Sequence, residues 1–129
     1  MAGLLLDTHT FLWWLAGDTK LSLAAREAIG DDPGPVFVSA ASIWEISTKH
    51  RSGKLPGASA IAGDLAAAIE GQGFIGMPIA IRHAQAAGAL PGPHRDPFDR
   101  MLIAQAILDD LTLISNERAF DAYGVRRRW

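Results

Sequence analysis

The sequence predicts an α/β fold in which helices cover both faces of a mostly parallel central sheet of about four to five strands, a three-layer α/β/α arrangement. Short apolar runs of strand length alternate with longer segments that have helical periodicity. The chain has 129 residues, of which 49% are hydrophobic and 20% charged. This length and composition suit one globular core, and no repeat or low-complexity linker divides it. We therefore assign residues 1–129 to a single domain.

The first predicted strand is the apolar run Gly3–Leu6, which ends at Asp7. Its lack of polar alternation is typical of a strand that is buried on both faces of a parallel sheet. Turn and cap residues then bound the next elements. These are a helix over Thr8–Leu15, a helix capped by Ser22 that ends near Ile29, a loop over Gly30–Pro35, a strand over Val36–Val38, a helix capped by Ser39 that ends near Arg51, and an alanine-rich helix over Ser59–Gln72.

The second half of the chain continues the alternation. Pro78 restricts the segment Phe74–Ile79 to an edge strand, because proline lacks the N–H that a central strand needs. Asp96-Pro97 is a strong signal for a helix start. The predicted elements are the edge strand, a helix over Ala80–Gly88, a stiff loop over Pro91–Arg95, a helix from Pro97 to about Asp110, a strand over Thr112–Ser115, a short helix over Glu117–Ala122 and a strand over Val125–Arg128.

Composition narrows the function classes. The chain has no cysteine, which excludes disulfides and thiolate metal sites. No apolar run reaches the ~20 residues that span a bilayer, and the N-terminus lacks the basic region of a signal peptide. We expect a cytoplasmic protein without a membrane partner. The formal net charge is −2, which argues against a purely electrostatic nucleic-acid binder, although Lys49, Arg51 and Lys54 cluster, as do the arginines at 126–128.

Ligands of open parallel sheets bind beyond the carboxyl ends of the strands, where this chain places acidic residues. Asp7 follows the first strand, and it is a candidate either for metal binding or for capping the next helix. Asp96 and Asp99 open the most apolar helix, where acids also suit the helix dipole. Asp99 shares a helical stripe with Ile103 and Ala106, so its side chain is expected to face the interior or a cleft.

A buried carboxylate at position 99 needs a metal ion or a basic partner, for which Arg100 is a candidate. Glu45 lies on the helix that follows the second strand, and by itself it has the pattern of an ordinary exposed glutamate. Glu117 follows the strand at Thr112–Ser115 and is also compatible with a first-turn helix acid. Taken together, these acids are expected to converge at one sheet end, where a divalent cation would offset their repulsion. Oxygen ligands favour Mg²⁺ or Mn²⁺ over zinc.

The chain resembles the PIN-domain ribonucleases, specifically the VapC-like toxins of bacterial type II toxin–antitoxin pairs. The ordered set of matching segments is specific and spans nearly the whole chain. The segments are Leu4-Leu5-Leu6-Asp7-Thr8-His9, Val38-Ser39-Ala40-Ala41-Ser42-Ile43-Trp44-Glu45-Ile46, His94-Arg95-Asp96-Pro97-Phe98-Asp99-Arg100-Met101-Leu102, Leu113-Ile114-Ser115-Asn116-Glu117 and Tyr123-Gly124-Val125.

The resemblance implies that Asp7, Glu45 and Asp99 form an acidic triad around Mg²⁺ or Mn²⁺, with Asp96 nearby. The fourth acidic position is often aspartate in the family and is Glu117 here, which favours contact through water. The resemblance also implies an RNA substrate, a homodimer, and an antitoxin that blocks the site and provides an indirect link to DNA. Ser115 is a further candidate for bonding to a metal-bound water or a phosphate.

Two other functions fit parts of the pattern. A haloacid-dehalogenase-like phosphohydrolase also carries an aspartate after its first strand, but it requires Asp-x-Asp where this chain has Asp7-Thr8-His9. A catalytically inactive PIN-fold binding module would keep the fold without the chemistry, although its acids would not need to be present.

The histidines and the paired tryptophans have simpler predicted roles. No two of the histidines at 9, 50, 83 and 94 have a metal-ligand spacing, so they are expected to be at the surface or hydrogen-bonded. Trp13 and Trp14 point in different directions if they are helical, so one is expected to pack inside and the other to be available for a dimer or antitoxin surface.

Overall fold

The computed structural model describes residues 3–129 and contains a five-stranded sheet in the order β3-β2-β1-β4-β5. All four neighbouring pairs are parallel. The strands are β1 (Leu4–Leu6), β2 (Val36–Ser39), β3 (Ile75–Met77), β4 (Thr112–Ile114) and β5 (Arg127–Arg128). The predicted α/β fold is confirmed, as is the edge position of the strand that precedes Pro78.

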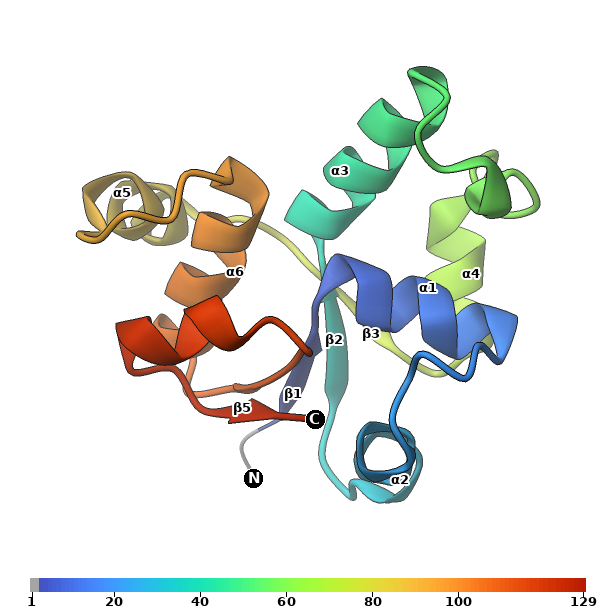
Figure 1. Cartoon of the computed structure of the whole chain (residues 1–129), viewed down its shortest axis with the longest axis horizontal. Helices are drawn as coiled ribbons and strands as arrows, with labels where there is room; N and C mark the ends of the chain where they lie inside the picture. Colours follow the sequence, from blue (N-terminus) through green and yellow to red (C-terminus); the bar gives the residue numbers. More distant parts are fainter. Residues whose placement is uncertain (1–2) are drawn as a thin grey trace.

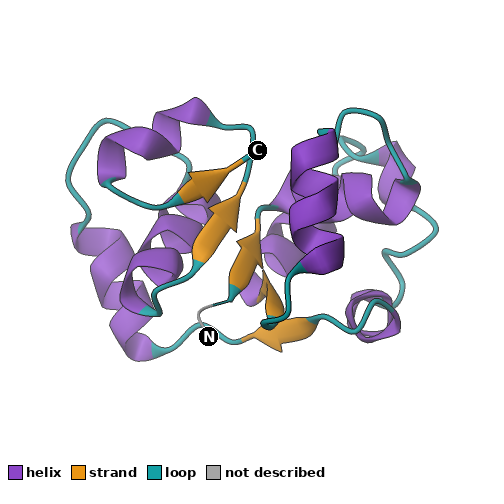
Figure 2. Ribbon diagram, turned by 90° about the horizontal axis from the view of Figure 1, so that it is seen from below, coloured by secondary structure: helices purple, strands orange, loops and turns teal. Residues whose placement is uncertain are grey.

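Helices form a layer on each side of the sheet (Figures 1 and 2). The first group is α1 (Thr8–Ala16), α2 (Leu23–Asp31), α3 (Ala40–Arg51) and α4 (Leu65–Gly71), and the second is α5 (Ile81–Ala89) and α6 (Pro97–Leu108). Two short 3₁₀ helices complete the fold, η1 (Pro56–Ala58) and η2 (Arg118–Tyr123). No helix within residues 3–129 is long and apolar enough to cross a membrane.

The β1 strand separates two hydrophobic cores, as its uninterrupted leucines predict. Leu4 and Leu6 belong to one core together with Phe11 of α1. Leu5 points to the opposite face and packs in the other core with residues of α6 such as Ile103. All three leucines are at most 3% exposed, so β1 is anchored on both faces. The residue that follows it is therefore held on a rigid element.

Two predicted helices differ from the structure. The alanine-rich segment Ser59–Gln72 is helical only in α4, because the carboxylate of Asp64 accepts a hydrogen bond from the Ala67 N–H and starts the helix there. The preceding residues form turns that connect η1 to α4. The predicted helix over Glu117–Ala122 is the 3₁₀ helix η2, and the last strand is shorter than Val125–Arg128.

The strand order reverses at β1, and open sheets of this kind bind ligands beyond the carboxyl ends of the strands at such a reversal. The chain moves outward from β1 through β2 to β3, whereas β4 and β5 lie on the other side of β1. Leu6 pairs with Ile114 across the β1–β4 boundary, and the Asp7 N–H donates to the Ile114 carbonyl over 3.2 Å. Asp7 and Ser115 therefore emerge side by side at the carboxyl edge of the sheet.

Candidate active site at the carboxyl edge of the sheet

A cavity of about 140 Å³ opens at this edge and brings all five predicted acids together. Its walls come from the end of β1 and the start of α1, from α3, from the start of α6, and from the segment after β4. The lining residues are Asp7, Thr8, His9, Glu45, Lys49, Asp96, Asp99, Asn116 and Glu117. The sequence thus predicted the convergence of these acids correctly.

Asp7 caps α1 and also forms the buried floor of the cavity. One oxygen, Oδ1, accepts a hydrogen bond from the Thr10 N–H at 2.9 Å, and the other accepts one from the Ser115 hydroxyl. Burial raises the pKa of Asp7 above its usual value, although these hydrogen bonds oppose the shift. Its capping role and its candidate site role are therefore compatible. Ser115 was a candidate for bonding to a metal-bound water or a phosphate. In the structure its buried hydroxyl donates to the Asp7 carboxylate instead.

Glu45 is buried, which corrects the prediction of an ordinary exposed glutamate. It lies on the cavity side of α3, where the Thr8 hydroxyl donates to its Oε1 at 2.6 Å. The Lys49 ammonium, one helical turn later, forms an ion pair with its Oε2. This hydrogen bond raises the pKa of Lys49. Sequence spacing alone had not shown that α3 turns this face toward Thr8.

Asp99 lies in the first turn of α6 and faces the cavity, as its helical stripe predicts. Burial raises its pKa from 3.8 to about 6, and the nearby carboxylates of Asp96 and Glu45 add to the shift. The basic partner is His94, whose Nε2 lies 2.8 Å from Asp99 Oδ2. Arg100, the partner suggested by sequence, instead donates to main-chain carbonyls of the loop before α6 and of α5.

Asp96 and Glu117 lie at the rim and are both bonded to their own backbone. Asp96 Oδ1 accepts hydrogen bonds from the N–H groups of Phe98 and Asp99, so it is the N-cap of α6. Glu117 Oε1 accepts from the Ala119 N–H and caps η2. Both carboxylates line the cavity and cap a helix, as Asp7 does, but unlike Asp7, Glu45 and Asp99 neither is hydrogen-bonded to another described side chain of the site.

The donor set suits a hard divalent cation. Five carboxylates and no thiol line the cavity, and burial raises the pKa of Asp7 and of Asp99, a shift that a nearby cation would oppose. Within residues 3–129, no three His, Cys, Asp or Glu side chains already converge as a ready-made metal site. The side chains instead bond to Ser115, Thr8, Lys49 and His94.

Two contributors to the site were missed or underestimated by sequence. Thr8 was assigned only as the first residue of a helix, although its hydroxyl orients Glu45. His94 was assigned to the class of surface or hydrogen-bonded histidines, which is correct, but no periodicity relates it to Asp99 five positions later. The signal that was present is its place in a stiff loop directly before the acid pair.

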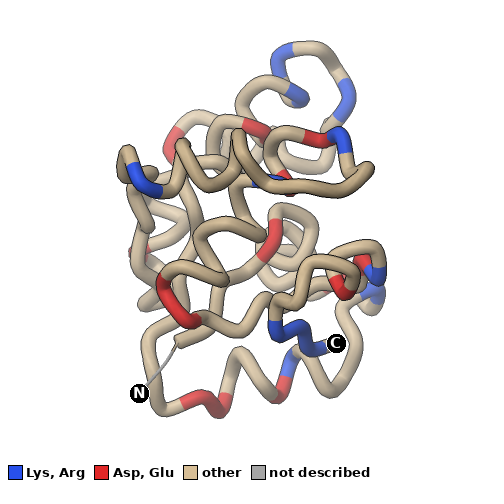
Figure 3. Tube along the Cα trace, turned by 90° about the vertical axis from the view of Figure 1, so that its left-hand side faces the viewer, with Lys and Arg blue, Asp and Glu red and all other residues tan. Residues whose placement is uncertain are grey.

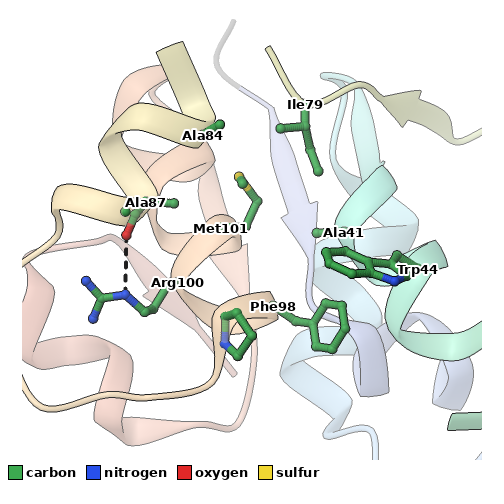
Figure 4. Close-up of a pocket in the computed structure, with 10 residues that line it drawn as sticks. Ala41, Trp44, Ile79, Ala84, Ala87, Phe98, Arg100 and Met101 are labelled. Carbon is green, nitrogen blue, oxygen red and sulfur yellow. Dashed lines mark hydrogen bonds between the residues drawn. The ribbon is translucent and has the colours of Figure 1, made fainter. Parts of the chain in front are cut away.

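An apolar pocket of about 240 Å³ lies behind the cavity, between α3, α5 and α6 (Figure 4). Trp44 and Phe98 meet there edge to face, with 4.9 Å between their ring centroids. Each precedes an acid of the site, since Trp44 is followed by Glu45 and Phe98 by Asp99. The aromatic contact therefore connects the two helices at the positions that carry these acids.

A larger groove of about 500 Å³ adjoins the cavity between α1 and the segment around η1. His9 lines both hollows, so the two surfaces are continuous. Trp13 lines the groove and Trp14 packs toward Phe74 with 6.0 Å between ring centroids. The two tryptophans point apart as predicted, but both are half-buried, so neither is fully inside.

The two basic clusters lie well apart in the molecule (Figure 3). One lies at the end of α3 and in the segment after it, and the other lies at the C-terminus. Lys49 belongs to the first and lines the carboxylate cavity, while Lys54 lines the adjoining groove. In the C-terminal cluster, Arg126 and Arg127 form ion pairs with Asp110 and Asp121.

Comparisons with known proteins agree with this geometry. The profile of the family described as "PIN domain" matches residues 4–125. A curated relative, Ribonuclease VapC22 of Mycobacterium tuberculosis, is 30% identical over 119 residues, which are 92% of this chain and 89% of the relative.

Solved structures share the fold at lower identity. DNA-bound VapBC from Salmonella typhimurium gives a TM-score of 0.70 at 17% identity, over 99% of this chain and 98% of that chain. Mycobacterium tuberculosis VapC20, described as a Sarcin-Ricin loop cleaving toxin, gives a TM-score of 0.64 at 17% identity, over 95% of this chain and 96% of that chain. VapBC2 from Rickettsia felis, bound to a promoter DNA fragment, gives a TM-score of 0.67 at 13% identity, over 96% of each chain.

Proposed function

Because the chain belongs to the PIN-domain family, we propose that it is a metal-dependent endoribonuclease that acts as the toxin of a toxin–antitoxin pair. The observation that carries this proposal is the meeting of five carboxylates in one cavity at the carboxyl edge of the sheet. Its relative VapC22, which is named a ribonuclease, supports the choice of RNA as substrate.

Asp7, Glu45 and Asp99 are the residues that would hold Mg²⁺ or Mn²⁺. They come from three separate elements and are the acids whose carboxylates are held by other side chains of the site. When bound, a divalent cation would neutralise negative charge on the scissile phosphate and lower the pKa of the attacking water. Binding would also remove the carboxylate repulsion that helps raise the pKa of Asp99.

The chain's own residues prepare the site for hydrolysis of an RNA phosphodiester. Thr10 and Ser115 fix both oxygens of Asp7, while Thr8 fixes Glu45. Lys49 is, among the described residues, the one lysine or arginine that lines the cavity, and its ammonium, which is paired with Glu45, is proposed to bind a phosphate oxygen of the substrate as well. Water would attack phosphorus and release one proton to solvent as its oxygen bonds to phosphorus, while the P–O bond to the leaving ribose oxygen breaks and that oxygen takes up one proton, so no net proton is gained or lost by the two oxygens.

Asp96 and Glu117 are proposed to act at the edge of this centre. Their carboxylates already accept backbone hydrogen bonds, so their contribution is negative charge and contact through water. Glutamate in the place of the family's frequent aspartate is consistent with this indirect role, because its longer side chain reaches back to its own helix end.

The adjoining groove is proposed to receive the cognate antitoxin. Leu12, Trp13 and Ile61 give it an apolar lining, and the shared residue His9 leads from it to the carboxylate cavity. A polypeptide held there would reach and cover the acids. The structural relatives described as DNA-bound VapBC complexes support this partner, and contact with DNA through the antitoxin is part of the proposal. A homodimer remains part of the proposal.

Cleavage of RNA by the purified chain tests the proposed activity. We expect endonucleolytic products with Mg²⁺ or Mn²⁺, none with EDTA, and a loss of at least about 100-fold in Asp7→Asn or Asp99→Asn, because each substitution removes a proposed ligand. Asp31→Asn is the matched control, since Asp31 is exposed and does not line the cavity. Full activity in Asp99→Asn, or folded protein that cleaves no RNA from a diverse pool, would contradict the proposal.

A further inference from the structure

Asp99 is the proposed ligand whose carboxylate is anchored through one oxygen only. Both oxygens of Asp7 and both of Glu45 accept hydrogen bonds from other residues. In contrast, Asp99 Oδ2 is bonded to His94 Nε2 at 2.8 Å, and within residues 3–129 no hydrogen bond reaches Oδ1. The Asp99 carboxylate is thus held from one side, while its second oxygen stays available to the cavity.

His94 is itself held from several directions, both at its main chain and at its ring. Its main-chain N–H donates to the Tyr123 hydroxyl at 2.9 Å, and its carbonyl accepts from Arg100 Nη1 at 2.9 Å. Its ring meets Phe120 edge to face, with 5.7 Å between centroids, and Tyr123 similarly at 6.4 Å. Because both the main chain and the ring of His94 are held, its imidazole has little freedom to move away from Asp99.

The loop that carries His94 is also fitted closely to Tyr123. Gly92 has a φ of +100°, and a Cβ added to it would lie 2.7 Å from the Tyr123 hydroxyl oxygen. A residue other than glycine would therefore both strain the backbone and displace the tyrosine. Tyr123 of η2 therefore holds the loop over Pro91–Arg95, and His94 of this loop contacts Asp99 in the first turn of α6.

We propose that His94 is a positioning residue that donates a hydrogen bond from Nε2 to Asp99 and so orients the free carboxylate oxygen for a divalent cation, with Tyr123 holding the imidazole in place. This inference rests on the proposed metal-dependent function and deepens it. Groups that hold a metal-binding side chain in this way typically change metal affinity 10–100-fold when they are removed.

Mn²⁺ binding to the metal-free full chain tests this role independently of cleavage. We expect electron paramagnetic resonance titration to show affinity about 10–100-fold weaker in His94→Ala than in the wild type. His94→Gln keeps an N–H donor that can reach Asp99, so its affinity should return to within a few-fold of wild type. Tyr123→Phe should give an intermediate loss, and His50→Ala, at a histidine outside the cavity, should give none.

Circular dichroism and thermal melts establish whether each variant is folded. If His94→Ala does not fold, the Mn²⁺ affinities of His94→Gln and Tyr123→Phe still test the proposal. Wild-type affinity in folded His94→Ala would overturn the positioning role alone. A Gln variant as weak as the Ala variant would also overturn it, because the ring and not the hydrogen bond would then matter. Absence of Mn²⁺ binding in the wild type would overturn the proposed metal-dependent function itself, so the two failures are distinguishable.

Discussion

At the scale of the residue, the Asp99 carboxyl group has a pKa that is raised well above its usual value. Burial, Asp96 and Glu45 all favour its protonated form, and the His94 hydrogen bond only partly compensates. Because its pKa in the folded protein is about 6 and its ordinary value is 3.8, the folded protein binds more protons than the unfolded chain between these values. The free energy of unfolding of the metal-free protein therefore falls as the pH rises through this interval.

Asp99→Asn should remove this loss of stability. We expect the metal-free variant to be more stable than the wild type at pH 7.5, by at most about 3 kcal/mol, because a pKa difference of one unit corresponds to about 1.4 kcal/mol. The difference should shrink toward pH 4, where the wild-type carboxyl is protonated. Urea unfolding in EDTA at several pH values measures it, with Asp31→Asn as control. An unchanged pH slope in Asp99→Asn contradicts the prediction.

At the scale of elements, the site depends on how α3 and α6 are held relative to each other. Their acids, Glu45 and Asp99, both line the cavity, and the residue that precedes each acid takes part in the Trp44–Phe98 contact. Trp44 is 63% exposed, so its ring contributes little burial to the fold. Its structural role is therefore the edge-to-face contact with Phe98 and not core packing.

Trp44→Ala should therefore affect cleavage more than stability. We expect activity to fall about tenfold, because small displacements of a catalytic group are costly, while the melting temperature changes by a few degrees at most. Trp44→Phe, which keeps an aromatic ring opposite Phe98, should retain most activity. Ile81→Ala is the matched control, since Ile81 is also an exposed apolar residue and does not touch the acids. Steady-state cleavage and thermal melts would be compared, and equal activity in Trp44→Ala and the wild type would refute the coupling.

At the scale of the whole molecule, the three proposed metal ligands, Asp7, Glu45 and Asp99, come from parts of the chain that are far apart in sequence, so metal binding is expected to stabilise the complete fold. A ligand that binds only the folded state adds about 2.7 kcal/mol when its concentration is 100 times its dissociation constant. Saturating Mn²⁺ should therefore raise the melting temperature of the wild type by several degrees and leave the melting temperature of Asp7→Asn nearly unchanged. Differential scanning calorimetry measures both, and an equal shift in the two proteins would indicate binding elsewhere.

The order of strands and helices follows from the sequence because apolar runs and cap residues are local signals. The uninterrupted leucines at 4–6 predicted a strand buried on both faces, and Asp96-Pro97 predicted the start of α6. Composition misled for the segment Ser59–Gln72, where alanine content suggested a long helix. The Asp64 cap instead starts a short one, since a satisfied N-cap determines where a helix begins.

The sequence by itself also determined that Asp7, Glu45, Asp99 and the two rim acids would meet, because residues that follow parallel strands share one sheet edge. Only the tertiary structure decided what holds each carboxylate. Thr8 reaches Glu45 over 37 positions and Ser115 reaches Asp7 over 108, while His94 rather than the adjacent Arg100 bonds to Asp99. Such partners depend on the packing of elements that are distant in sequence, and no local propensity or periodicity encodes that packing.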